Sequence, residues 1–95
     1  MQKLFEKKSW THFFQTIKAG RKLHDLREDE GYQIGDILVL QEYDNINGSY
    51  TGDQVEAEVT YITDRTVPCA FSSAVLAPGY CILSLKLIHS LKELA

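Results

Sequence analysis

The sequence predicts an α+β domain in which five or six mainly antiparallel strands form a small barrel, with one helix packed over an opening. Two observations predict this class. Apolar residues recur at helical spacing up to Gly20, and beyond it apolar and polar residues alternate with the period of a strand. The run Ile37–Leu40 is apolar on both faces, which is typical of a strand buried on both sides. The 95 residues suffice for one hydrophobic core, so residues 1–95 are expected to form a single domain.

The helix is expected over Trp10–Ala19, after a short strand that starts near Leu4. Ser9 is a suitable N-cap residue, and Gly20 stands where helices commonly end in a left-handed residue. Apolar side chains at positions i, i+3, i+4 and i+7 share one face of a helix. Four residues follow this spacing and are expected to face the core: Trp10, Phe13, Phe14 and Ile17.

A charged strand is predicted at Lys22–Arg27, where three charges stand among ordinary strand residues. The alternation of a strand puts Asp25 and Arg27 on one face, about 7 Å apart and within reach of an ion pair. This pair either contributes to a ligand site or only neutralises itself at the rim of the barrel. A turn at Gly35 then leads into Ile37–Leu40, which we expect to be the central strand.

The second half of the chain predicts two further strands and a long loop. A tight turn at Gly48 precedes Val55–Tyr61, in which apolar and polar residues alternate cleanly. The loop is expected over Thr63–Pro78, and a last apolar strand over Tyr80–Leu85. The residues expected to be buried in the core are Trp10, Phe14, Ile17, Leu38, Leu40, Val59 and Ile82.

A short C-terminal helix is predicted because four apolar residues repeat at helical spacing near the end of the chain. These residues are Leu87, Ile88, Leu91 and Leu94. The apolar face of this helix either caps the barrel or pairs with a second copy. A monomer and a homodimer formed through the C-terminal helix therefore both stay open.

The composition excludes several classes of protein. The formal net charge is −3 and the pI is near 5.5, which disfavours broad coating of nucleic acid but leaves room for a local basic groove. No apolar run is long enough for a secretory signal or a membrane span, so we expect a cytoplasmic protein without membrane contact. Cys69 and Cys81 lack metal-ligand spacing and are expected to be free thiols. We expect no metal and no cofactor, and no common catalytic motif is present.

The segment that starts at Gly20 carries a motif that points to a known group of proteins. It reads GRKLHDLREDEGYQIGD and contains the charged residues Lys22, Asp25 and Arg27, followed by a Gly-Asp turn. This arrangement resembles the ASC-1-homology/PUA-like superfamily, whose pattern is GxKxxExR followed by GD, with Asp25 in place of the glutamate. More closely, the chain resembles the DUF3850 group of small bacterial and phage proteins. The downstream YTG at Tyr50 matches that group, although Asp53 replaces a basic residue that usually follows.

The resemblance implies a PUA-like barrel with a helix after the first strand, and a site around the motif. Lysine and arginine supply donors, aspartate supplies an acceptor, and tyrosines supply a stacking surface, which together suit a nucleobase and its phosphate. No catalytic residue is assigned. The expected ligand-binding residues are Lys22, Asp25, Arg27, Tyr43, Tyr50, Thr51 and Arg65.

Three functions from different classes stay open. The first is a bacterial or phage module that binds RNA or a modified nucleoside. The second, which the resemblance implies, is a nucleoside amidohydrolase or a ribonuclease that uses Lys22, although Asp25 stands where the amidohydrolases of that superfamily have a threonine nucleophile. The third is a phage protein that binds and modulates a host protein through acidic surfaces, for which Glu28–Glu30, Glu56 and Glu58 are the candidates.

Overall fold

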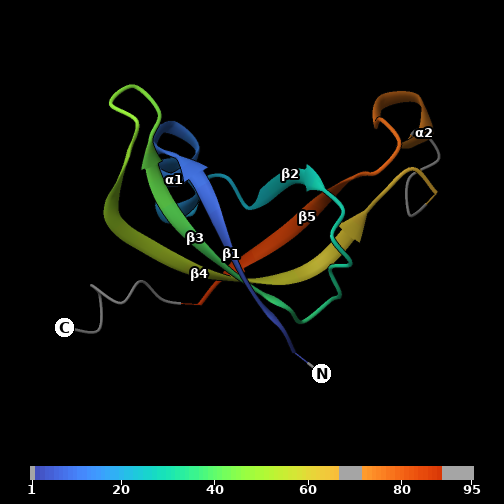
Figure 1. The fold of residues 1–95 in the computed structure, drawn as a ribbon. Helices are drawn as coiled ribbons and strands as arrows, with labels where there is room; N and C mark the ends of the chain where they lie inside the picture. Colours follow the sequence, from blue (N-terminus) through green and yellow to red (C-terminus); the bar gives the residue numbers. More distant parts are fainter. Residues whose placement is uncertain (1, 67–71, 89–95) are drawn as a thin grey trace.

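The structure is a computed structural model that describes residues 2–66 and 72–88 (Figure 1). It is mostly β, with a five-stranded sheet that curls into a half-barrel and one short helix beside it. A further single helical turn, α2, precedes the last strand. The elements in chain order are β1 (Leu4–Trp10), α1 (Thr11–Lys18), β2 (His24–Glu28), β3 (Ile37–Asp44), β4 (Ser49–Thr63), α2 (Ser72–Val75) and β5 (Tyr80–Leu87).

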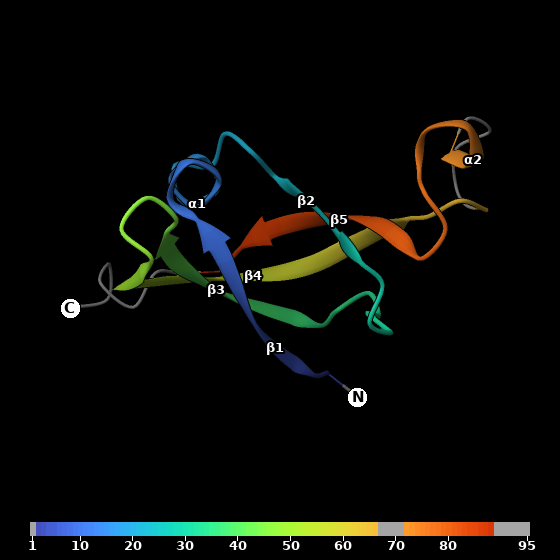
Figure 2. The same ribbon diagram turned by 45° about the horizontal axis from the view of Figure 1, so that its top comes forward.

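The strand order is β1-β3-β4-β5-β2, so the first two strands of the chain form the two edges of the sheet. Strand β1 pairs with β3 in parallel, and the other three pairs are antiparallel. The chain passes from one edge to the other through α1, which spans only about 12 Å at helical rise, and a short turn. So short a connection can join strands at opposite edges of the sheet only because the sheet curls and brings its two edges close together. Figure 2 shows α1 at the end of β1, from where the chain returns into β2.

A side chain bridges the two edges. Nη2 of Arg27 in β2 donates a hydrogen bond of 2.8 Å to the carbonyl oxygen of Lys8 in β1. Among the described residues, no backbone ladder joins β1 to β2. We call this junction between the two edges the seam. Farther along β1, the ring of Tyr32 packs on Phe5 and Lys7 pairs with Glu30, so the loop after β2 covers the rest of the seam.

The core confirms most of the predicted buried residues. Five residues of that predicted set are fully buried, namely Phe14, Ile17, Leu38, Leu40 and Val59. Ile82 is only half-buried. The prediction was wrong for Trp10, which is 49% exposed and belongs to β1 rather than to the helix. Its neighbour Ser9 takes the inward position of the strand and is buried, so the alternation of β1 turns Trp10 outward.

Helix α1 is shorter than the predicted Trp10–Ala19. Trp10 occupies the N-cap position in extended conformation and makes no side-chain capping bond, so Ser9 is not the N-cap residue. Only two side chains of the helix are fully buried, Phe14 and Ile17, while Phe13 is 45% exposed. A helix of eight residues has one narrow face toward the sheet, and the predicted aromatic stripe is wider than that face.

Strand β3 is buried on both faces along Ile37–Leu40, as predicted. It does not occupy the middle of the sheet, because β1 pairs along its other side and β4 takes the central position. Strand β4 alternates as predicted up to Val59, where its register against β5 shifts. This irregularity explains why Tyr61 is 45% exposed instead of following Val59 into the core.

The end of the chain is described as far as Ile88. Leu87 ends β5, so it does not begin the predicted helix. The remaining residues of that prediction, Leu91 and Leu94, lie outside the described residues. In the predicted loop Thr63–Pro78, the described part contains α2. No helix within residues 2–66 and 72–88 is long and apolar enough to cross a bilayer.

Candidate functional site

The motif residues of the charged segment meet at one carboxylate. Asp25 is 9% exposed on the inner face of β2, and its Oδ2 lies 2.6 Å from Nε of Arg27. Its Oδ1 lies 3.7 Å from Nζ of Lys22. The predicted ion pair between Asp25 and Arg27 is confirmed, and Lys22 joins it. Two cations stabilise the charge of a carboxylate that burial alone would destabilise.

The backbone around α1 places these cations. Gly20 adopts a positive φ of 78°, which ends the helix and lets the chain turn back toward the sheet. Nζ of Lys22 then donates 2.8 Å to the carbonyl of His24 as well as approaching Asp25. Arg27 uses Nε for Asp25 and Nη2 for the carbonyl of Lys8. The guanidinium is therefore fixed between β1 and β2.

Two adjoining pockets open along this junction. One of about 270 Å³ lies between β1, α1 and β2, and the other, of about 320 Å³, lies between α1 and the start of β2. They share Phe13, Asp25 and Leu26 as lining residues. We call the two together the seam groove. The residues that line it are Lys8, Ser9, Trp10, Phe13, Lys22, His24, Asp25, Leu26 and Arg27.

The seam groove combines exposed rings with positive charge. Trp10 and Phe13 are 49% and 45% exposed, and both belong to its wall. Nζ of Lys22 lies 5.7 Å from the centroid of the Phe13 ring, within the range of a cation–π contact. Three cations and one carboxylate line the groove, so its local charge is positive in a protein whose net charge is −3.

Ser9 adds a buried hydroxyl to the same groove. The residue is 5% exposed and lines the pocket beside Asp25 and Arg27. Its side chain makes no hydrogen bond to another residue of the described ranges 2–66 and 72–88. The hydroxyl is thus a donor and acceptor available to a molecule in the groove.

A second polar cluster lies where β4 bulges against β3. Gln41 pairs with Gln54, and the next pair is Tyr43 with Tyr50, so three residues of β4 lie opposite Glu42. The middle one, Gly52, has a φ of 91°, which only glycine adopts at low cost. The threonine and glycine of the YTG sequence therefore belong to the bulge, which consists of Thr51, Gly52 and Asp53.

The carboxylate of Glu42 is held by several donors. Oγ1 of Thr51 donates 2.6 Å to one oxygen, and Nε2 of Gln15 donates 3.0 Å to the other. Burial raises the pKa of Glu42, but hydrogen bonds from Gln15, Thr51 and Thr11 outweigh it and lower the pKa below its usual value. Nζ of Lys18 meets Asp53 at 2.6 Å, so α1 is tied to the bulge at two points.

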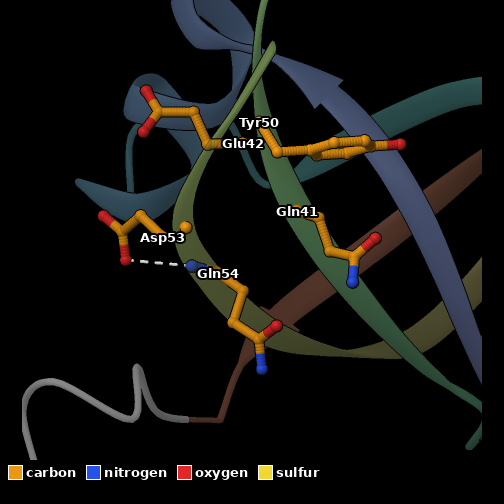
Figure 3. Close-up of a pocket in the computed structure, with 6 residues that line it drawn as sticks. Gln41, Glu42, Tyr50, Asp53 and Gln54 are labelled. Atoms are coloured by element: carbon orange, nitrogen blue, oxygen red, sulfur yellow. Dashed lines mark hydrogen bonds between the residues drawn. The ribbon is translucent and has the colours of Figure 1, made fainter.

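A pocket of about 270 Å³ lies at this bulge (Figure 3). We call it the bulge pocket. Glu42 and Asp53 lie together on one side, and Tyr50 and Gln41 point to the other. Its lining residues are Gln41, Glu42, Tyr50, Gly52, Asp53 and Gln54.

The structure brings some predicted site residues together and separates others. Tyr43 and Tyr50 form an edge-to-face pair with centroids 5.1 Å apart, and Nζ of Lys8 lies 4.1 Å from the Tyr43 centroid. Lys8 therefore connects these tyrosines to the seam groove. Thr51 instead faces Glu42. Arg65 donates 2.8 Å to the carbonyl of Leu76, beyond the opposite end of β4 from Tyr50.

The sequence predicts that Lys22, Asp25 and Arg27 line one rim between the end of the helix and the loops Asp44–Asp53 and Thr63–Pro78. The groove that they line lies beside the helix, between β1, α1 and β2, and none of the described residues of those two loops lines it. Sequence reasoning missed the contributions of Lys8, Trp10 and Phe13. The alternation of Lys8 and Trp10 around Ser9 was the available signal, because it fits an edge strand with an outward-facing tryptophan.

The fold and the site define a mostly β domain whose curled sheet leaves a small aromatic and cationic groove at its seam. No group of three or more His, Cys, Asp or Glu residues suited to a metal ion occurs in the described part of the chain. The chain belongs to the family described as Domain of unknown function (DUF3850), whose model matches residues 4–85. It is 37% identical over 65 residues to an "Uncharacterized 12.9 kDa protein in GpA 3'region" of Escherichia phage P2. That match covers 67% of this chain and 58% of the relative.

Proposed function

We propose that this protein is a PUA-like module that binds RNA or a modified nucleoside in the seam groove. The observation that carries the proposal is the exposure of Trp10 and Phe13 beside Lys8, Lys22 and Arg27. Large aromatic side chains are normally buried in a hydrophobic core, whereas here two of them are exposed in the wall of a positively charged groove. Stacking of a base on such rings contributes about 1–3 kcal/mol per base in single-stranded nucleic acid binding.

The charged residues of the groove have three roles in this proposal. The ammonium groups of Lys8 and Lys22 attract a phosphate. A carboxylate offers about four acceptor sites, and the contacts of Asp25 with Arg27 and Lys22 leave capacity for the amino group of a base. Arg27 holds Asp25 in place and keeps the two edge strands together.

A hydrolytic function is the second candidate, favoured by the contact between Lys22 and Asp25. Their charged atoms lie 3.7 Å apart, so Asp25 could act as a general base while Lys22 stabilises a developing oxyanion. This chemistry differs from that of the hydrolases with a threonine nucleophile. An assay with an acylated cytidine separates the two functions, since binding without turnover supports the binding module.

The test uses Trp10, the one tryptophan of the chain, as a fluorescent reporter in the groove. Uridine 5′-monophosphate and uridine are titrated into the wild type, into Lys22→Ala and into Arg21→Ala. Arg21 is exposed and does not line the groove, so the two variants lose the same charge from adjacent positions. Circular dichroism verifies that each variant is folded.

We expect the monophosphate to quench Trp10 and to bind more tightly than uridine, with an affinity that falls as salt rises. Lys22→Ala should weaken binding about tenfold, since hydrogen bonds to charged groups contribute about 1.5–3 kcal/mol. Arg27→Ala should weaken it as well. Equal affinities of Lys22→Ala and Arg21→Ala, or no binding by the wild type, would refute the proposal. The acidic surfaces would then be the next candidates, as contacts for a host protein.

A further inference from the structure

Three aromatic residues lie side by side across neighbouring strands. The parallel register pairs Trp10 of β1 with Tyr43 of β3, and the antiparallel register pairs Tyr43 with Tyr50 of β4. Paired residues of neighbouring strands present their side chains on the same face of the sheet. We call these three residues the aromatic row. Its two ends are exposed, Trp10 at 49% and Tyr50 at 55%.

The middle of the row is held on both sides. The ring of Tyr43 meets Tyr50 edge to face, with an interplanar angle of 75°, and the ammonium of Lys8 lies over the Tyr43 ring at 4.1 Å. Edge-to-face and cation–π contacts of this kind restrict the rings to one arrangement. Lys8 and Trp10 also line the seam groove. The groove and the row are therefore one continuous surface across β2, β1, β3 and β4.

The bulge pocket lies at the far end of the row, where Tyr50 forms part of its wall. The paired residues Gln41 and Gln54 bring two side-chain amides to it. An amide can donate to one base edge and accept from another. The carboxylates of Glu42 and Asp53 line the same pocket. Lys18 compensates the charge of Asp53, whereas Glu42 is held by the neutral donors Gln15 and Thr51 and repels phosphate. A base rather than a phosphate therefore suits this end, whereas the cations of the seam groove suit phosphate at the other.

We propose that the ligand is a single-stranded RNA several nucleotides long, which runs from the seam groove across the aromatic row to the bulge pocket. This inference rests on the proposed function and extends its site. One base stacks on Trp10 and another on Tyr50, which lie two strands and therefore about 10 Å apart. Lys8 contacts the backbone between them. A duplex does not fit this mode, because its bases are already stacked and paired.

The experiment compares a mononucleotide with an oligonucleotide on matched tyrosine variants. Uridine 5′-monophosphate, a labelled hexauridylate and a short RNA duplex are titrated into the wild type, Tyr50→Ala and Tyr61→Ala. Tyr61 is the control because it lies on the same strand with a similar exposure of 45%, but outside the aromatic row and the bulge pocket. Lys22→Ala is measured with the same ligands.

We expect the hexauridylate to bind the wild type at least about tenfold more tightly than the monophosphate, because a second base is stacked. Tyr50→Ala should lose about tenfold in affinity for the hexauridylate and keep its affinity for the monophosphate. Tyr61→Ala should bind both ligands like the wild type. A hexauridylate affinity of Tyr50→Ala equal to that of the wild type would overturn the inference, as would a duplex that binds as tightly as the single strand.

The same titrations distinguish a failure of the extended site from a failure of the groove. If the monophosphate binds through Lys22 and the hexauridylate binds no more tightly, the groove is the whole site and only the extension is wrong. If the hexauridylate depends on Tyr50 while Lys22→Ala has no effect on either ligand, the aromatic row binds RNA and the proposed role of the groove is wrong.

Discussion

Replacing Phe14 by alanine should destabilise the fold by about 3–5 kcal/mol, which is the usual cost of truncating a large aromatic residue in a core. The side chain is fully buried in the main hydrophobic cluster, and α1, which carries it, packs against β3 and β1. Domains of this size are stable by only about 5–15 kcal/mol. Each kcal/mol shifts the melting temperature by about 4–8 °C, so the midpoint should fall by more than about 10 °C.

The adjacent residue provides a matched control for this change. Phe13 is 45% exposed, so its truncation removes less buried apolar area than the truncation of Phe14. Phe13→Ala should therefore lower the free energy of unfolding by about 1 kcal/mol or less. The same variant should weaken nucleotide binding, since its ring lines the seam groove. Urea and thermal unfolding measure both variants. Similar midpoints for Phe13→Ala and Phe14→Ala would refute the assignment of one ring to the core and the other to the groove.

Three further predictions concern the bulge and the buried thiol. Because the pKa of Glu42 is lowered on folding, its charge contributes stability above its ordinary value of 4.5 that is lost as pH falls through the lower, folded value. Glu42→Gln should thus be less stable than the wild type at pH 7, with a smaller difference near pH 3, as urea midpoints would show. Gly52→Ala should lower the free energy of unfolding by about 1–2 kcal/mol, because Gly52 has a φ of 91° that a residue with a Cβ adopts only under strain. An unchanged urea midpoint would contradict this backbone conformation at the bulge. Burial raises the pKa of Cys81 to about 11, so in a Cys69→Ser background it should react with a thiol reagent only after unfolding, and rapid native labelling would contradict its burial.

Local patterns in the sequence predicted the elements and part of the core. The helical spacing of Phe14 and Ile17 and the two-sided apolar run Ile37–Leu40 both correspond to buried surfaces. Trp10 fits the same helical spacing, but it is the last residue of β1, and spacing alone does not fix where a strand ends and a helix begins. One of the two strands that flank β3 is β1, which is distant from it in sequence. Local periodicity carries no information on that pairing.

The candidate site was predictable only where its residues are close in sequence. Lys22, Asp25 and Arg27 converge because a turn and the two-residue period of β2 bring them together. Lys8 and Trp10 reach the same groove through the curl of the whole sheet, which no short motif encodes. Arg65 was expected at the site, but the fifteen-residue strand β4 carries it to the other end of the sheet from Tyr50.

The central claim, that the seam groove is the ligand site, is tested most directly by NMR mapping of amide shifts during titration with uridine 5′-monophosphate. We predict that the largest shifts occur at Lys8–Trp10, Phe13 and Lys22–Arg27, together with the indole N–H of Trp10. Shifts confined to the acidic residues Glu56 and Glu58, or a spectrum unchanged at millimolar ligand, would contradict the claim.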